Sequence, residues 1–461
     1  MEEAAVLVAG IDSSTQSTKI LLCRAEDGTV VAQASALHPD GTECHPRHWW
    51  TALENAGRDL FDRADAVAVA AQQHGMVVLD GAGGVIRPAL LWNDTRSAPQ
   101  AQALVEEFGA ETWAARTGLV PVASFTVTKL RWLAEQEPDN AKRTETVLLP
   151  HDWLTLRLGA HEPVTDRGDA SGTGYWSPAT GTYLPGFVRA AIGHDVRLPR
   201  VAGPYDIVGE TSWGAKLGPG TGDNMGAALG LGLEPGDVVV SIGTSGTAFA
   251  TAEEPAADAS GQVAGFADAT GRFLPLVATL NAARVLSSTA ALLGCSLEEL
   301  SALALAARPG ADGLTLLPYL DGERTPNRPD ATGVLRGLTT SNSTRENLAR
   351  AAVEGLLASL ADAVDHLTSH GVRLRRVLLI GGGARSLAVR QLAPAVFGVP
   401  VSVPEPGEYV ALGAARQAAW ALAGTPEPPA WPRPEAREYE AAPTPQVREQ
   451  YGALRDATES W

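Results

Sequence analysis

The sequence predicts an α/β protein built from two similar lobes. Strand-like apolar runs alternate with segments of helical periodicity along most of the chain, an order typical of α/β folds. A strand, a polar turn and a returning strand occur near residue 10 and again near residue 243, which indicates a weak internal duplication. The alternative is that hairpins of small residues recur by chance. A length of 461 residues suits two large domains.

The first half of the chain opens with a predicted meander of three strands, at residues 5–12, 18–24 and 29–34. Further strands are predicted at 67–71, 76–80 and 147–149, and helices at 98–108 and 129–136. Several of these strands end in polar residues.

The pattern restarts after the glycine-rich segment 218–222. The predicted elements there are a helix at 223–231, strands at 237–242, 248–251 and 377–380, and helices at 344–370 and 413–422. Ser343 and Glu346 have capping-box spacing, and Gly371 suits the position after the helix end. Five prolines in 425–434 predict an extended tether, and 446–461 predicts a short terminal helix.

Composition and charge exclude several classes of protein. The net charge of −17 repels phosphate backbones and anionic lipid, so we expect neither nucleic-acid binding nor membrane binding. Three scattered cysteines provide neither a disulfide framework nor a four-ligand zinc site, and they fit a cytoplasmic protein. The acidic start does not resemble a signal peptide, and no run of about 18 apolar residues predicts a membrane span.

The sequence also lacks several well-known catalytic motifs. None of the four lysines follows a glycine, which excludes a Walker A loop, and neither HExxH nor DFG occurs. The glycines at 381–383 do not form the dinucleotide-binding fingerprint. If the protein uses ATP, it does so with another architecture.

Two aspartates are candidates for phosphate chemistry. Asp12 ends the first strand and is followed by small hydroxyl residues, a setting that can hold hydrated Mg²⁺ beside phosphate, although an ordinary Asx turn is the alternative. Asp223 follows a glycine-rich segment and opens a helix, where a carboxylate can take a proton from a hydroxyl nucleophile. A simple helix N-cap is the alternative for Asp223.

Other candidates are glycine-rich loops and polar clusters at predicted strand ends. The loops 243–247 and 381–383 expose backbone amides that can face phosphates, and tight turns are their alternative. The polar clusters suit a ligand with many hydroxyl groups, whereas core packing and local ion pairs are the alternatives. These clusters are Gln73 with His74, Trp92, Asn93 and Asp94 with Arg96, and Asp166 with Asp169.

The order of these motifs resembles the FGGY family of carbohydrate kinases, from about residue 6 to residue 422. The resemblance rests on collinear segments, none of which is decisive by itself. They are GID at 10–12 with Thr15, QQHG at 72–75, LWNDTR at 91–96, LPHDWL at 149–154, TD at 165–166 with DASGT at 169–173, GDN at 222–224, SIGTSG at 241–246, LPYLDGERTP at 317–326 and LIGGGARS at 379–386.

The resemblance implies two ribonuclease-H-like lobes of the actin/hexokinase type around a central cleft. It implies transfer of the ATP γ-phosphoryl group to a sugar hydroxyl, with O5 of D-xylulose as the expected acceptor and Mg²⁺ as the metal. The first lobe, residues 1–221, is expected to bind mainly sugar, and the second, residues 222–440, mainly nucleotide; residues 441–461 form a tail. A homodimer is expected from the resemblance alone.

The resemblance also assigns roles to individual residues. Asp223 matches the catalytic base, and Asp12 and Asp223 match the metal ligands. The remaining assignments are Asp12, Thr15, Gly243, Thr244, Ser245, Gly382, Gly383 and Ala384 for the nucleotide, and Gln73, His74, Asn93, Asp94, Asp223 and Asn224 for the sugar.

Two residues depart from the family pattern. Ser14 occupies a position where many members have glycine, and Gln73 stands before His74 where methionine is typical. An extra amide in a sugar pocket adds a hydrogen bond or changes the preferred sugar. Kinases of ribulose, xylitol or glycerol, and a non-catalytic sugar sensor, therefore stay as alternatives.

Overall fold

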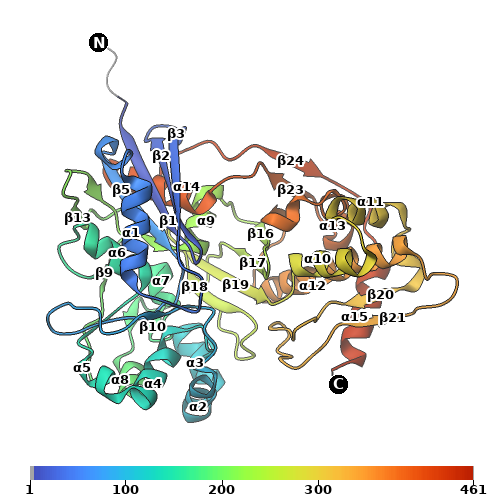
Figure 1. The fold of residues 1–461 in the computed structure, drawn as a ribbon, viewed down its shortest axis with the longest axis horizontal. Coiled ribbons are helices and arrows are strands. Elements are labelled where there is room, and N and C mark those ends of the chain that lie inside the picture. Colours follow the sequence, from blue (N-terminus) through green and yellow to red (C-terminus); the bar gives the residue numbers. More distant parts are fainter. Residues whose placement is uncertain (1–4, 460–461) are drawn as a thin grey trace. The chain divides into compact units, whose positions relative to one another are not determined.

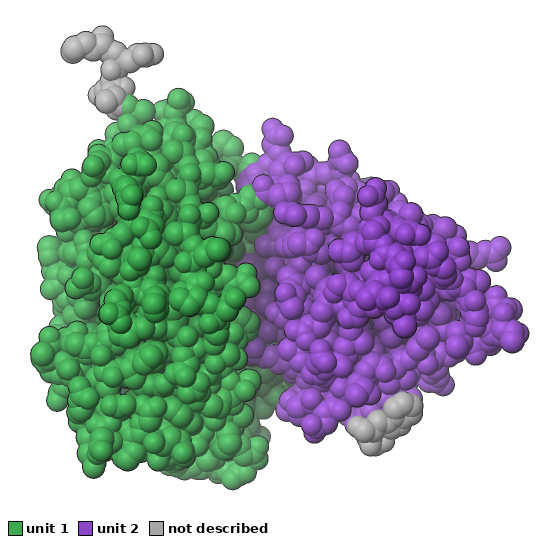
Figure 2. All heavy atoms as spheres, in the orientation of Figure 1, with its two compact units in different colours: residues 1–233, 253–274, 407–433 green, residues 234–252, 275–406, 434–461 purple. Residues whose placement is uncertain are grey.

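The computed structural model describes residues 5–459 and divides into two compact units (Figures 1 and 2). Unit 1 contains the chain up to Leu233, Glu253–Leu274 and Gly407–Arg433. Unit 2 contains Glu234–Ala252, Pro275–Pro406 and the chain from Pro434 onward. The chain therefore passes from one unit to the other five times.

The central sheet of unit 1 is mixed, with the strand order β13-β14-β5-β1-β2-β3, and β15 also pairs with β5. Its strands are β1(Leu7–Ser13), β2(Ser17–Arg24), β3(Val30–Leu37), β5(Ala66–Ala71), β13(Gly209–Glu210), β14(Lys216–Leu217) and β15(Thr221–Gly222). β1 is antiparallel to β2 and parallel to β5, and β15 is parallel to β5. The carboxyl ends of β1, β5 and β15 therefore lie at the same edge of the sheet.

Apolar sequence explains why these strands are central. All six residues of β5 are buried, as in a strand covered on both faces. Helix α14(Tyr409–Ala423) packs against β1 and β5, and a Cβ atom on Gly10 of β1 would lie only 1.9 Å from the backbone oxygen of Ala411. Glycine at position 10 therefore allows the helix to lie directly on the sheet.

The remaining helices of unit 1 cover the sheet or form the region below it in Figure 1. They are α1(Pro46–Gly57), α2(Ala98–Phe108), α3(Ala110–Thr117), α4(Thr126–Gln136), α5(Pro138–Arg143), α6(Pro150–Leu158), α7(Arg167–Ser171), α8(Pro185–Ile192) and α9(Asp223–Leu231). The short strands β6(Val77–Leu79) and β8(Thr146–Leu148) pair with each other away from the central sheet.

Unit 2 repeats the strand arrangement of unit 1. Its strands are β16(Asp237–Ile242), β17(Gly246–Ala250), β19(Phe273–Thr279), of which residues from 275 belong to this unit, β22(Arg376–Ile380), β23(Val401–Pro404) and β24(Ala436–Tyr439). β16 is antiparallel to β17 and parallel to β22, and β17 is antiparallel to β19. The order β19-β17-β16-β22 thus corresponds to β3-β2-β1-β5, so the predicted α/β class and repeated hairpin are both confirmed.

The helices of unit 2 are α10(Ala283–Leu293), α11(Leu297–Ala306), α12(Arg345–Ser369), α13(Leu387–Phe397) and α15(Pro445–Ala457). The predicted capping box at Ser343 is wrong, because the α12 cap is Thr344, whose hydroxyl accepts a hydrogen bond from Asn347 N at 3.1 Å. The Ser343 hydroxyl instead donates to the carbonyl oxygen of Thr339. Gly371 has a positive φ of 88°, as expected after a helix end.

The proline-rich segment 425–434 contains no helix or strand, as predicted, and it packs on unit 1 through Trp431. The Trp431 indole donates to the carbonyl oxygen of Ala25 at 2.9 Å.

Within residues 5–459, no single helix is both long and apolar enough to cross a membrane. The bent pair of α10 and α11 has the length and the apolar composition of a membrane span, but these two properties are the only ones that it shares with one.

Candidate active site

Asp12 lies at the carboxyl end of β1, in register with Ala70 of β5 and Lys19 of β2. The Ser14 hydroxyl donates to Asp12 Oδ1 at 2.5 Å, and Lys19 forms an ion pair with Glu408. Burial raises the pKa of Asp12 to about 6, although the Ser14 hydrogen bond and the Lys19 charge oppose the rise. A buried carboxylate that ionises at such a cost favours binding of a cation.

Asp223 is the first residue of α9, directly after β15. Gly222 occupies the N-cap position, so the N-cap alternative for Asp223 is wrong. Asp223 Oδ1 accepts hydrogen bonds from Asn224 N at 2.7 Å and Asn224 Nδ2 at 2.9 Å. Loss of hydration, followed by the negative charges of Asp12 and Asp169, raises the pKa of Asp223 to about 7. Both Asp223 and Asn224 keep part of their surface accessible to solvent.

The Asp12 carboxylate acts electrostatically on Asp223. The Asp12 charge is one reason for the raised pKa of Asp223. Carboxylate oxygens are the ligands that Mg²⁺ prefers in proteins, and a divalent cation would relieve the repulsion between two such groups. The donor chemistry of this edge of unit 1 therefore fits Mg²⁺.

Gln73 and His74 follow the end of β5, and Gln73 lies beside the start of α9. Asn224 Nδ2 donates to Gln73 Oε1 at 3.2 Å, so two predicted sugar-binding residues contact each other. His74 has a positive φ of 68°, which is uncommon for a residue other than glycine and often marks a functional site. Its Nδ1 lies 2.9 Å from the carbonyl oxygen of Gly172, and its ring packs edge-on against Phe125.

Thr15 and Asn93 belong to loops that meet in unit 1. The indole of Trp92 donates to Thr15 Oγ1 at 2.8 Å, which joins the β1–β2 turn to the segment after β7(Ala89–Leu90). Since Thr15 Oγ1 accepts from Trp92, its own proton can point toward another acceptor. Asn93 Nδ2 lies 3.5 Å from the carbonyl oxygen of Gly41 and the residue is only partly buried.

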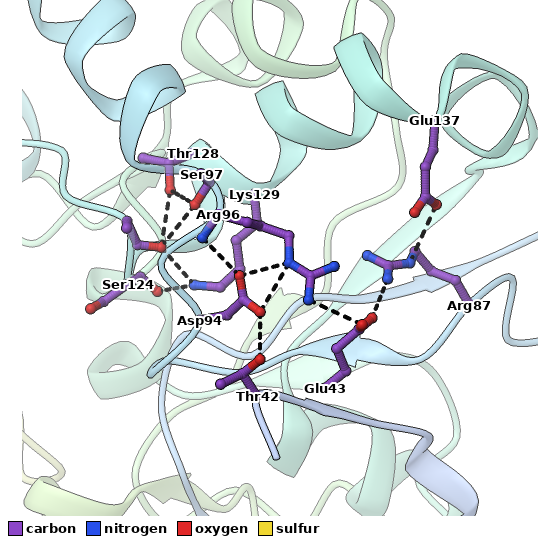
Figure 3. A network of polar contacts seen from close by, with 11 residues as sticks. Thr42, Glu43, Arg87, Asp94, Arg96, Ser97, Ser124, Thr128, Lys129 and Glu137 are labelled. Carbon is purple, nitrogen blue, oxygen red and sulfur yellow. Dashed lines mark hydrogen bonds and ion pairs between the residues drawn. The ribbon is translucent and has the colours of Figure 1, made fainter.

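Asp94 lies at the centre of the polar network in Figure 3. Its Oδ1 accepts from Arg96 Nε at 2.8 Å, and its Oδ2 accepts from the Thr42 hydroxyl at 2.7 Å. Burial alone would raise the pKa of Asp94, but these hydrogen bonds outweigh it and lower the pKa. Arg96 also pairs with Glu43 at 3.0 Å. Both oxygens of Asp94 are thus already engaged, so a role in sugar binding stays a prediction.

In unit 2, two glycine-rich loops lie against each other. The first follows β16 at Gly243, and the second follows β22 at Gly381. A Cβ atom on Gly381, which has a positive φ of 87°, would lie 2.7 Å from the backbone oxygen of Ile242, and one on Gly383 would lie 2.2 Å from Ile242 Cγ2. Only glycine allows this close approach.

The loop residues predicted to hold the nucleotide differ in exposure. Thr244 is exposed and Ser245 is partly buried at the β16–β17 turn. Gly382 is exposed, with no atom within 4 Å of a Cβ position, whereas Ala384 is buried in the short 3₁₀ turn Gly382–Arg385. The exposed backbone of these loops is available to a phosphate-bearing ligand.

The structure thus distributes the predicted site residues between the two units. Unit 1 holds Asp12, Thr15, Gln73, His74, Asn93, Asp94, Asp223 and Asn224; unit 2 holds Gly243, Thr244, Ser245, Gly382, Gly383 and Ala384.

Sequence reasoning missed the buried partner of Asp169, which is His151. His151 Nδ1 contacts Asp169 Oδ2, and His151 Nε2 lies 3.3 Å from Asp152 Oδ1, with all three side chains fully buried. Burial alone would lower the pKa of His151, but the charges of Asp152 and Asp169 raise it to about 9. Their ligand atoms lie within 4.8 Å of one another, as a metal site requires, but the contact between His151 Nδ1 and Asp169 Oδ2 already engages one imidazole nitrogen.

Two family profiles match almost the whole chain. The profile of the FGGY family of carbohydrate kinases, N-terminal domain, matches residues 7–230, and that of the C-terminal domain matches residues 238–422.

Individual proteins give the same result. The chain is 48% identical to a xylulose kinase of Streptomyces coelicolor over 91% of this chain and 88% of that protein. It is 35% identical to a xylulose kinase of Escherichia coli over 91% and 90% of the two chains. The crystal structure of a xylulose kinase from Bifidobacterium adolescentis has a TM-score of 0.92 at 45% identity and covers 98% of this chain and 100% of that chain.

Proposed function

The chain belongs to the FGGY family of carbohydrate kinases, and on that premise we propose that it transfers the γ-phosphoryl group of ATP to D-xylulose. The products are D-xylulose 5-phosphate and ADP. The observation that carries the proposal is the carboxyl group of the partly buried Asp223, at the start of α9, with a pKa of about 7. A base with a pKa near the working pH is the most effective acceptor of a hydroxyl proton.

Asp223 acts as the general base in this proposal. Its carboxylate removes the proton from O5 of the sugar while that oxygen bonds to the γ-phosphorus and the bond from phosphorus to the ADP oxygen breaks. The hydrogen bonds from Asn224 to Asp223 Oδ1 hold the carboxylate in one orientation and leave Oδ2 for the proton. The donated proton then leaves with the products.

Asp12 and Asp223 would hold Mg²⁺, directly or through water. Bound Mg²⁺ offsets the charge that develops on the phosphate oxygens during transfer. The positive charge of bound Mg²⁺ would lower the pKa values of both carboxyl groups, so Asp223 would stay ionised in the enzyme that carries Mg²⁺ and ATP.

We propose that unit 2 binds most of the nucleotide. The turn at Gly243, Thr244 and Ser245 would face the phosphates, and Gly382, Gly383 and Ala384 would face the adenosine. Thr15 of unit 1 would direct its hydroxyl proton to a phosphate oxygen, because Trp92 already donates to its oxygen.

The sugar would be bound mainly by the first lobe, residues 1–221, with Asp223 and Asn224 added. Gln73 and His74 supply an amide and an imidazole, and Asn93 and Asp94 complete the predicted set. Since Gln73 stands where methionine is typical, another ketose or polyol is the second candidate acceptor. The same base and the same metal ligands of this chain would serve either acceptor.

A coupled assay of ADP release with MgATP tests the proposal. The acceptors would be D-xylulose, D-ribulose, L-ribulose, xylitol and glycerol. We expect the highest kcat/KM with D-xylulose; a higher value with another acceptor would transfer the assignment to that sugar. Absence of sugar-stimulated turnover would support the sensor alternative. A cytoplasmic location and a homodimer stay predictions, which fractionation and light scattering would check.

A further inference from the structure

One oxygen of the buried Asp169 carboxylate is not used by its His151 partner. Asp169 Oδ2 contacts His151 Nδ1, whereas Oδ1 has no hydrogen-bond partner by distance and angle among residues 5–459. The side-chain nitrogen of Gln73, Nε2, is likewise buried and unpartnered in that part of the chain. Buried polar atoms without partners are rare in folded proteins, so this pair needs an explanation.

The two unpartnered atoms belong to side chains that converge on one backbone position. A Cβ atom on Gly222 would lie 2.9 Å from Asp169 Oδ1 and 2.9 Å from Gln73 Cγ. Burial raises the pKa of Asp169, and the charge of His151 and the nearby Gln73 side chain oppose that rise. Glycine at 222, directly before Asp223, therefore leaves room for the carboxylate and the amide to face each other.

The orientation of the Gln73 amide follows from its other contact. Its Oε1 accepts from Asn224 Nδ2 at 3.2 Å, and the same Nδ2 donates to Asp223 Oδ1 at 2.9 Å. With the oxygen turned toward Asn224, the NH₂ group is left for Asp169. An amide held at both ends has one orientation, whereas a free amide can rotate by half a turn.

The neighbouring carboxylates have other partners. Asp166 accepts from Gly168 N at 2.8 Å, Asp169 N at 2.9 Å and the Thr221 hydroxyl at 3.0 Å. Asp152 Oδ2 accepts from Leu149 N at 2.8 Å, and its Oδ1 lies 3.3 Å from His151 Nε2. Within this cluster, only Asp169 has an oxygen beside Gln73.

We propose that Asp169 is a positioning residue for sugar recognition. Held by His151, it fixes the Gln73 amide so that Gln73 and Asn224 present one set of donors and acceptors to the sugar beside Asp223. The proposal rests on the proposed function, because it needs Gln73 and Asn224 in the sugar site. It also gives a role to the residue at which this chain departs from the usual methionine.

Exchanging donor and acceptor tests the contact directly. Asp169→Asn places an NH₂ group against the Gln73 NH₂ group, and we expect kcat/KM for the sugar to fall about tenfold. Gln73→Glu places two carboxylates together, and we expect a loss of about 100-fold. The double variant Q73E/D169N restores a donor facing an acceptor, so its kcat/KM should be about tenfold higher than that of Gln73→Glu alone. The KM for ATP should stay unchanged throughout.

Two control backgrounds separate positioning from a general structural role. In Gln73→Met, which has no amide, adding Asp169→Asn should cost less than about twofold in kcat/KM. Asp152→Asn is the matched control for burial, because Asp152 also lies beside His151 but does not face Gln73. The double variant Q73E/D152N should therefore have a kcat/KM no higher than that of Gln73→Glu alone. Two results would overturn the proposal. One is a kcat/KM of Q73E/D169N that falls by the product of the two single losses; the other is a tenfold loss of kcat/KM when Asp169→Asn is added to Gln73→Met.

Folding of each variant is checked by its thermal unfolding midpoint. If Asp169→Asn alone does not fold, Gln73→Glu is compared with Gln73→Met, and the carboxylate variant must be the weaker enzyme; equal activities would overturn the proposal. Failure of the proposed function is distinguishable, because wild-type protein would then show no sugar-stimulated ADP release at all.

Discussion

Replacing Asp12 by asparagine should stabilise the ligand-free protein while it damages catalysis. Asn keeps the oxygen that accepts the Ser14 hydroxyl and removes a charge that the fold makes costly. The rise of the Asp12 pKa from 3.8 to about 6 corresponds to about 3 kcal/mol of lost stability when the group is ionised. Asp12→Asn should recover most of this free energy of unfolding at neutral pH.

The pH dependence follows from the sign of the shift. Because the folded pKa lies above the unfolded value, the unfolded chain releases the proton first. Stability is therefore fully present below the unfolded pKa of 3.8 and is lost as pH rises through the folded pKa of about 6. The advantage of Asp12→Asn should grow from about 1.5 kcal/mol at about pH 5 to about 3 kcal/mol at about pH 7.5.

Urea unfolding followed by tryptophan fluorescence, with a chelator present, measures both values. Mg²⁺ should stabilise wild type more than Asp12→Asn, because the variant lacks one ligand. A variant no more stable than wild type at neutral pH, or an advantage that does not grow between the two pH values, would refute the electrostatic reasoning.

Four further predictions concern activity and local structure. Asp223→Asn should lower kcat about 10²–10⁴-fold in the coupled assay while the unfolding midpoint is retained, and near-normal turnover would exclude Asp223 as the base. In wild type, kcat/KM should fall as pH decreases below about 7, because Asp223 becomes protonated, with the midpoint shifted lower when Mg²⁺ is bound; a profile flat down to about pH 5 would contradict this. Gly383→Ala places a methyl group 2.2 Å from Ile242 Cγ2, so the KM for ATP should rise severalfold with little change in the KM for sugar. Asp94→Asn should lower stability by about 2 kcal/mol in chemical unfolding, because Arg96 loses its charged partner; an unchanged midpoint would show that Glu43 suffices.

Helices and strands whose apolar pattern starts and stops abruptly could be predicted from the sequence to within about one residue at each end. The ranges 223–231, 237–242 and 98–108 coincide with α9, β16 and α2. The start of α12 was harder, because Ser343 and Thr344 are both good caps and are adjacent. The choice depends on the contact of Ser343 with Thr339, which capping preference does not encode.

The candidate residues could be identified from residue type and motif order, but their contacts could not. Asn224 and Gln73 are 151 residues apart, and Trp92 and Thr15 are 77 apart, and neither pair has a local signal. The buried ring of His151 was missed for the same reason. Such contacts depend on how distant strands meet, which one sequence does not specify.

The packing of α14 on β1 has a consequence for the order in which the protein is made. The first strand of the sheet leaves the ribosome early, but the helix that covers Gly10 ends at Ala423 of 461 residues. N-terminal domains generally fold during synthesis, but unit 1 can complete its core only after residue 423 has been made. One apolar face of the unit 1 sheet therefore stays uncovered in the nascent chain until α14 emerges.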